Sequence, residues 1–176
     1  ALHKASPVVL LALLKHPLCA CGMQPGQIRP QVRAFEQAIL RGLRPAPGVA
    51  ALVSMLKNVE AGPGVLGLME YFQQAAEPFF SLFSQQRVRF SKILKAHLAF
   101  VEQLSANAEH SAAERLWGQE EGEALAAFLA ELMGQADTLE MIDPSAYPGL
   151  LGQLLGAEVY RPAYGMHPRL HIYSPH

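Results

Sequence analysis

Hydrophobic residues recur at the spacing of an α-helix along most of this chain. Ser6-Pro7 is typical of a helix start, and the almost wholly apolar residues 8–15 predict a short buried helix that Pro17 ends. Residues 17–26 contain two prolines and two glycines and predict a loop. A second helix is expected over residues 30–40. The chain is therefore predicted to begin with two helices and a loop between them.

The helical spacing continues to about residue 160, interrupted by glycine, proline and polar residues. Further helices are expected over residues 49–58, over 65–77 and 78–86 as one kinked helix or two abutting ones, over 88–108 as the longest, over 120–136 and over 150–160, with a short turn at 111–118. Five aromatic residues are close together in the sequence and predict the centre of the core: Tyr71, Phe72, Phe79, Phe80 and Phe83.

These elements predict an all-α fold, an irregular bundle of seven or eight helices with one short C-terminal strand. The strand is expected over residues 169–173, where polar and apolar residues alternate. One strand without a partner cannot form a sheet, so a partner strand is expected outside this chain. We therefore expect a helical domain over residues 1–160 and an extended tail over residues 161–176 that leads to a missing motor-like domain.

Composition narrows the class of protein. Of the 176 residues, 51% are hydrophobic and 16% are charged, which excludes intrinsic disorder. No uncharged apolar run is long enough to cross a membrane. Cys19 and Cys21 are too few and too close for a disulfide framework, so a reducing compartment is expected. Composition thus favours a cytoplasmic globular protein.

Charge is distributed unevenly, although the net charge is only -1 and excludes a uniformly basic nucleic-acid-binding protein. Residues 1–98 carry eleven Lys and Arg against four Glu, and residues 99–176 carry three Arg against eleven Asp and Glu. The densest basic cluster is predicted to form one stripe on a helix: Arg87, Arg89, Lys92 and Lys95. A stripe of this kind suits phosphate contact. The alternative is an ordinary solvated face.

The sequence contains no phosphate-binding loop, no dinucleotide-binding glycine motif and no serine-hydrolase elbow. Cys19 and Cys21 are separated by one residue, whereas zinc sites place two to four residues between paired cysteines. His16 beside them, and the pair His167 and His171, are therefore expected to be loop residues. His97 falls on an apolar helix face and is expected in the core or at its boundary. We expect no catalytic residue, no metal and no cofactor in this chain.

Three stretches resemble the alphaproteobacterial AddB family. They are residues 6–18, which contain Leu-Leu-Lys-His-Pro-Leu; Glu36 with residues 40–48, which contain Leu-Arg-Gly; and residues 158–170, where Arg-Pro precedes Tyr164-Gly165 and His-Pro-Arg-Leu. AddB is the helicase-like and nuclease subunit of AddAB, a complex that processes DNA double-strand breaks for recombinational repair. Where the family continues with Gly-Pro-Leu-Glu-Ala-Arg, this chain has Ser174-Pro175.

The resemblance implies a helical insertion between motor-like strands, comparable to the 2B subdomain of superfamily 1 helicases. Its role would be non-catalytic within an ATP-dependent bacterial helicase/exonuclease. The implied partners are the rest of the parent chain, an AddA-type helicase subunit and DNA, whereas the family's iron-sulfur cluster and Mg belong to a nuclease domain elsewhere. Arg41 and Arg44 would join the basic stripe in contacting DNA. A freestanding helical adaptor remains the alternative.

Overall fold

The computed structural model describes residues 6–40, 49–57 and 62–158, which fold as an all-α protein. The helices of these residues are α1 (Pro7–Leu14), α2 (Pro25–Phe35), α3 (Val49–Lys57), α4 (Pro63–Phe80), α5 (Phe90–Ser105), α6 (Ala112–Leu116), α7 (Glu120–Gln135) and α8 (Tyr147–Ala157). Two short strands, β1 (Val88–Arg89) and β2 (Met141–Ile142), pair antiparallel. The predicted fold class is confirmed. None of the described helices combines the length and apolarity that a bilayer crossing requires.

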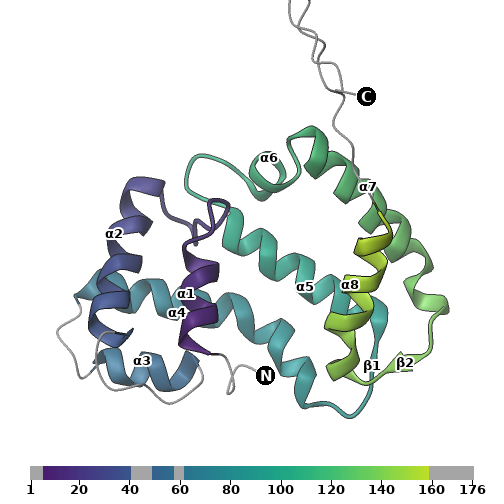
Figure 1. Cartoon of the computed structure of the whole chain (residues 1–176), viewed down its shortest axis with the longest axis horizontal. Helices are drawn as coiled ribbons and strands as arrows, with labels where there is room; N and C mark the ends of the chain where they lie inside the picture. Colours follow the sequence, from purple (N-terminus) through teal and green to yellow (C-terminus); the bar gives the residue numbers. More distant parts are fainter. Residues whose placement is uncertain (1–5, 41–48, 58–61, 159–176) are drawn as a thin grey trace, which may run out of the picture.

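Helices α4 and α5 form the centre of the molecule (Figure 1). α4 contacts α2, α3 and α5, and α5 contacts α6 and α7 in turn. The helices from the N-terminal part lie on one side of this pair, and those from α6 onward lie on the other (Figure 1). The order of the helices in space therefore largely follows their order in the sequence, as expected where contacts are mostly local.

Aromatic rings join α4, α5 and α8 in the core. The Phe79 ring stacks on His97 with centroids 4.7 Å apart and on Phe100 at 6.0 Å, and meets Tyr147 edge-on at 6.0 Å. Phe72, Phe80 and Phe83 belong to the same cluster, as predicted. Tyr71 does not, since its hydroxyl instead donates a hydrogen bond to the Gln103 carbonyl at 2.9 Å.

Several predicted helix bounds were wrong. α2 begins at Pro25 rather than Pro30, because a proline in the first turn has no amide donor to lose. Pro30 then removes only one backbone hydrogen bond within the helix. Of the two arrangements expected around Pro78, the structure has one helix through the proline: α4 reaches Phe80 and, at 18 residues, is the longest described helix, which the segment over 88–108 was expected to be. The predicted longest helix starts later than expected because residues 88–89 pair with β2.

Helix α1 and the pair of short strands also differ from the predictions. The apolar helix α1 was predicted to be buried, but only Pro7, Leu10 and Leu14 are. Val8 and Val9 are 69% and 67% exposed. The pair of strands β1 and β2 was not predicted, since two-residue strands are too short for a visible alternation. The predicted strand over 169–173 lies outside the described residues, as do Arg41, Arg44 and the tail over 161–176.

Candidate functional site

The basic stripe was predicted on one helix, but only Lys92 and Lys95 lie on α5, because Arg89 belongs to β1 and Arg87 precedes it. Arg89, Lys92 and Lys95 are exposed. Arg87 is used structurally, because its guanidinium donates from Nε, at 3.2 Å, and from Nη2 to the Met141 carbonyl of β2. The described members of the stripe are therefore close together. Arg87, however, uses its guanidinium to hydrogen-bond β2.

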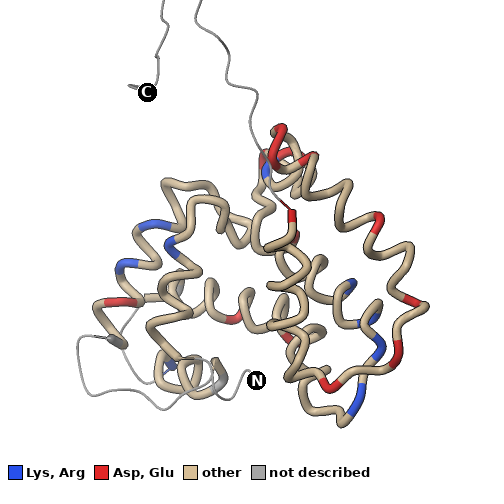
Figure 2. Tube along the Cα trace, turned by 45° about the vertical axis from the view of Figure 1, so that its right-hand side comes forward, with Lys and Arg blue, Asp and Glu red and all other residues tan. Residues whose placement is uncertain are grey.

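Acidic residues adjoin this stripe. Arg89 pairs with Met141 across the small sheet, and Glu140 is the next residue along that strand segment. Figure 2 shows red positions of the segment between α7 and α8 close to the blue positions of β1 and α5. The stripe is therefore a mixed surface, on which neighbouring carboxylates weaken the attraction for phosphate.

A second group of cations was missed by the sequence analysis. It surrounds a cavity of about 510 Å³ between α1, α2 and the loop that joins them. The cationic side chains that line it are Lys15, Arg29, Arg33 and Arg115. Figure 2 shows blue positions gathered on α2 and at the end of α1. The spacing of Arg29 and Arg33, which puts both on one face of α2, was the available sequence signal.

The cavity combines this cationic rim with an apolar floor. Leu14, Ile28 and Val32 are buried side chains that line it. At the rim the Lys15 Nζ lies 2.8 Å from Glu36 Oε2, an ion pair that ties the end of α1 to the end of α2. The rim carries one carboxylate against four cations and is net positive.

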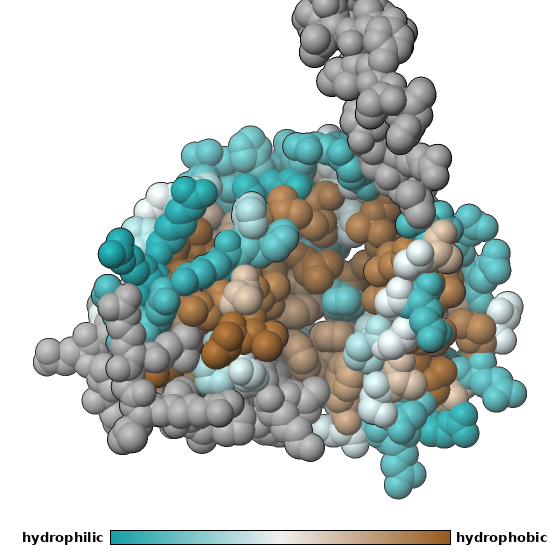
Figure 3. Space-filling model, in the orientation of Figure 1, coloured by the Kyte–Doolittle hydropathy of each residue, from teal (hydrophilic) through white to brown (hydrophobic). Residues whose placement is uncertain are grey.

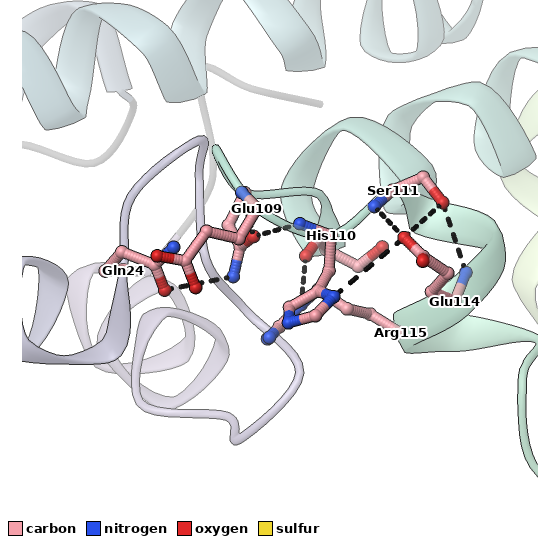
Figure 4. Close-up of polar contacts among 8 residues, drawn as sticks. Gln24, Glu109, His110, Ser111, Glu114 and Arg115 are labelled. Carbon is pink, nitrogen blue, oxygen red and sulfur yellow. Dashed lines mark hydrogen bonds and ion pairs between the residues drawn. The ribbon is translucent and has the colours of Figure 1, made fainter.

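Arg115 reaches the cavity from α6 and is fixed in place by backbone carbonyls. Its Nε donates to Ser105, and its Nη2 lies 3.5 Å from the Pro17 carbonyl and 3.4 Å from the Leu18 carbonyl. Figure 4 shows the capping box that positions α6, in which Ser111 N donates to Glu114 Oε2 at 2.7 Å. A preorganised guanidinium therefore forms one wall.

Two thiols lie beside this wall. Cys19 and Cys21 are both buried, with their sulfur atoms 3.6 Å apart. Cys19 lines the cavity, whereas Cys21 is not among the residues that line it. The hydrogen bond from Cys21 lowers the pKa of the Cys19 thiol, and the charge of Arg115 adds to this effect while desolvation opposes it. The same hydrogen bond, together with burial, raises the pKa of Cys21.

The backbone from Ala20 to Met23, which includes Cys21, forms a tight turn. Met23 N donates to the Ala20 carbonyl at 2.9 Å, and the central residues Cys21 and Gly22 have φ of 49° and 76°. Positive φ at both central positions defines a type I′ turn. The amides of Ala20 and Cys21 donate to the Leu104 carbonyl at the end of α5. The turn is thus anchored to the core.

An apolar groove of about 220 Å³ lies on the other side of Cys19. Leu13, Leu18, Val101 and Leu116 line it. The exposed side of α1, with Val8 and Val9, continues from Leu13 along the same helix. Figure 3 shows apolar, brown side chains gathered over α1. The described surface therefore includes an apolar strip that the fold itself does not cover.

His97 lies in the core boundary, as predicted. Its Nδ1 is 2.9 Å from the Tyr147 hydroxyl, and desolvation lowers its pKa. Among the described residues, no three His, Cys, Asp or Glu side chains are grouped closely enough to hold a metal ion. His16, Cys19 and Cys21 do not form such a group.

Comparison with known proteins gives no match, whether with protein-family models, with curated proteins or with solved structures.

Proposed function

We propose that this chain is a non-catalytic helical domain of an AddB-type subunit of an ATP-dependent helicase/exonuclease that processes DNA double-strand breaks for recombinational repair. The observation that supports the proposal best is the exposed apolar strip of α1. Within α1, Val8 and Val9 are 69% and 67% exposed and Leu13 is 38% exposed, and Leu18 in the following loop is 39% exposed. All four belong to residues 6–18, the stretch in which the resemblance to the AddB family begins.

An exposed strip of this kind favours a surface that packs against another domain. Contiguous exposed apolar residues mark interaction sites in soluble proteins. Burying one valine side chain contributes about 1.5–3 kcal/mol, so two valines would contribute usefully to docking. The occupant under this proposal is the motor-like part of the same parent chain, and α1 is the element that contacts it.

DNA contact is assigned to the exposed part of the basic stripe. Arg89, Lys92 and Lys95 are exposed at the start of α5 and are able to reach phosphate groups. In this proposal Arg41 and Arg44, which lie outside the described residues, also contact DNA. ATP, the iron-sulfur cluster and Mg are supplied by other parts of the bacterial complex, and the AddA-type subunit is the partner.

The test is a charge substitution on the strip, made in the full-length parent subunit and assayed in the assembled complex. Val8→Glu together with Val9→Glu should lower ATP-dependent digestion of linear duplex DNA by at least about tenfold, because a buried unpaired carboxylate opposes docking. Leu139→Glu, at a residue 44% exposed on the segment leading into β2, is the matched control. Full activity of the double variant would contradict the proposal.

The alternative function is a freestanding adaptor that holds a partner segment in the apolar groove beside Leu13 and Leu116. The encoding gene distinguishes the two functions. A downstream reading frame with Gly-Pro-Leu-Glu-Ala-Arg and a nuclease domain supports the AddB-type subunit. A stop codon soon after His176 supports the adaptor and excludes the parent subunit.

A further inference from the structure

We propose that Cys19 and Cys21 form a thiol–disulfide exchange site for small anionic disulfides of the glutathione type, which enter through the cation-rimmed cavity. The proposal does not depend on the AddB-type function. It combines three features of the described residues: a close pair of thiols, a cavity that only one of them lines, and a positive rim.

The placement of the two thiols suits sequential reaction. Their sulfur atoms are 3.6 Å apart, and a disulfide bond needs about 2.05 Å, so the sulfur atoms have only a short distance to close. Cys19 is 8% exposed and lines the cavity, whereas Cys21 is 2% exposed behind it. An incoming disulfide therefore meets Cys19 first, and Cys21 is the resolving thiol.

The backbone keeps the thiols close. The type I′ turn from Ala20 to Met23 holds Cys21 at φ 49°, and Gly22 N donates to the Ala106 carbonyl at 2.9 Å. The turn is therefore fixed against the end of α5, and the pair need not be assembled by a loop movement. The lowered pKa of Cys19 gives the outer sulfur more thiolate character than the inner one.

The rim selects the charge of the reagent. Oxidised glutathione carries four carboxylates and two ammonium groups, so it is a net anion at neutral pH. Arg29 and Arg33 are exposed on the rim, and Arg115 is oriented into the wall by backbone carbonyls. Charges of this arrangement raise the local concentration of an anionic reagent, and a cavity of about 510 Å³ leaves room for one glutathionyl group.

The reaction consumes one disulfide and releases two thiols. The Cys19 thiolate attacks one sulfur of the reagent, a Cys19–glutathione disulfide forms, and the other half leaves as a thiolate that takes up a proton. Cys21 then gives up its proton and attacks the Cys19 sulfur, and the second glutathione leaves. The two protein thiols are oxidised to a disulfide, and the reagent is reduced to two molecules of glutathione.

In the first experiment the reduced chain is mixed with oxidised glutathione. Samples are quenched with acid, and the mass of the intact chain is measured over time. The wild-type chain should form the internal disulfide with little mixed disulfide. Cys21→Ser should stop at one glutathione on Cys19, and Cys19→Ser should react at least about tenfold more slowly. Equal reactivity of the two single variants would overturn the assigned order. Thermal unfolding of each variant shows that it is folded.

The second experiment varies the charge of the reagent. The rate of the chain is measured with oxidised glutathione and with neutral hydroxyethyl disulfide. Each rate is divided by the rate at which the same disulfide reacts with free cysteine. The chain should favour the anionic reagent by about tenfold, and Arg29→Gln with Arg33→Gln should reduce this preference by at least about threefold. Lys57→Gln removes an exposed cation that does not line the cavity, and the preference should remain.

Two results would contradict the exchange site outright. One is a glutathione reaction no faster than global unfolding measured by hydrogen exchange, since the thiols would then react only in the unfolded chain. The other is the absence of any preference for the anionic reagent in the wild-type chain.

Discussion

At the scale of single residues, His97 shows how burial decides a protonation state. Its ring stacks on Phe79 with centroids 4.7 Å apart, and its Nδ1 is 2.9 Å from the Tyr147 hydroxyl. Desolvation disfavours the imidazolium, so the pKa of His97 is lowered in the folded chain. The neutral ring therefore belongs to the contact between α5 and α8.

We predict that this residue makes stability depend on pH. The unfolded chain takes up a proton near the ordinary histidine pKa of about 6.5, whereas the folded chain takes it up only at lower pH. The free energy of unfolding should therefore fall as the pH drops below about 6.5. Urea denaturation between about pH 5 and pH 8 measures it. His97→Gln should flatten this dependence, and an unchanged slope in that variant would count against the assignment.

At the scale of elements, the turn from Ala20 to Met23 shows what a local backbone requirement does. Its two central residues, Cys21 and Gly22, have positive φ. A residue with a β-carbon is strained at such an angle, whereas glycine is not. A β-carbon on Gly22 would lie 3.4 Å from Tyr71 Cε2, so the cost of a side chain there comes from the dihedral angle rather than from a clash. The turn contains Cys21, one of the two thiols.

We therefore predict that Gly22→Ala destabilises the chain by about 1 kcal/mol. Gly26→Ala is the matched control, because Gly26 lies in the first turn of α2 and nothing lies within 4 Å of an added β-carbon. The control should be neutral or slightly stabilising. Chemical denaturation of both variants measures the difference, and equal effects at the two glycines would refute the role of the turn.

At the scale of the whole molecule, the aromatic cluster joins the central helices α4 and α5 to α8. Phe79 extends from α4 to rings on α5 and α8, with centroid distances of 4.7 Å to His97 and 6.0 Å to Tyr147. It is 7% exposed. Much of the core between these helices therefore depends on one side chain.

Phe79→Ala should lower the free energy of unfolding by about 3–5 kcal/mol, because it removes buried contacts and leaves a cavity. Leu139→Ala, at a residue 44% exposed, should cost less than about 0.5 kcal/mol. Urea denaturation with circular dichroism measures both. A loss at Phe79 no larger than that at Leu139 would show that the cluster does not stabilise the fold.

The sequence predicted the helices well where helix signals are local. Ser6-Pro7 marks the start of α1, and Glu120, Glu121 and Glu123 mark the start of α7, and the structure begins both helices there. Pro30 misled the prediction, because it lies inside α2 and not at its start, whereas the helix that continues through Pro78 is one of the two arrangements expected there. A helix tolerates the loss of one hydrogen bond when its other contacts hold it. The pairing of residues 88–89 with 141–142 involves segments far apart in the sequence and gave no local signal.

One candidate site was visible in the sequence, and the other was not. The stripe of Arg89, Lys92 and Lys95 was visible because helical neighbours are three residues apart. The cation-rimmed cavity was not, because Arg115 comes from α6 and the other cations come from α1 and α2. The exposure of Val8 and Val9 was also hidden, since an apolar helix carries no sign of which face its neighbours cover.

The amino-acid sequence by itself thus determined the class of fold, the positions of most helices and the one-residue spacing of the two thiols. These follow from hydrogen bonds and side-chain preferences that act within a few residues. The tertiary structure decided which side of α1 stays exposed, that Arg87 donates hydrogen bonds to the Met141 carbonyl of β2, and that cations of α2 and α6 line the same cavity as Cys19. Burial and electrostatic environment depend on how helices pack, and packing joins residues that the local pattern leaves unrelated.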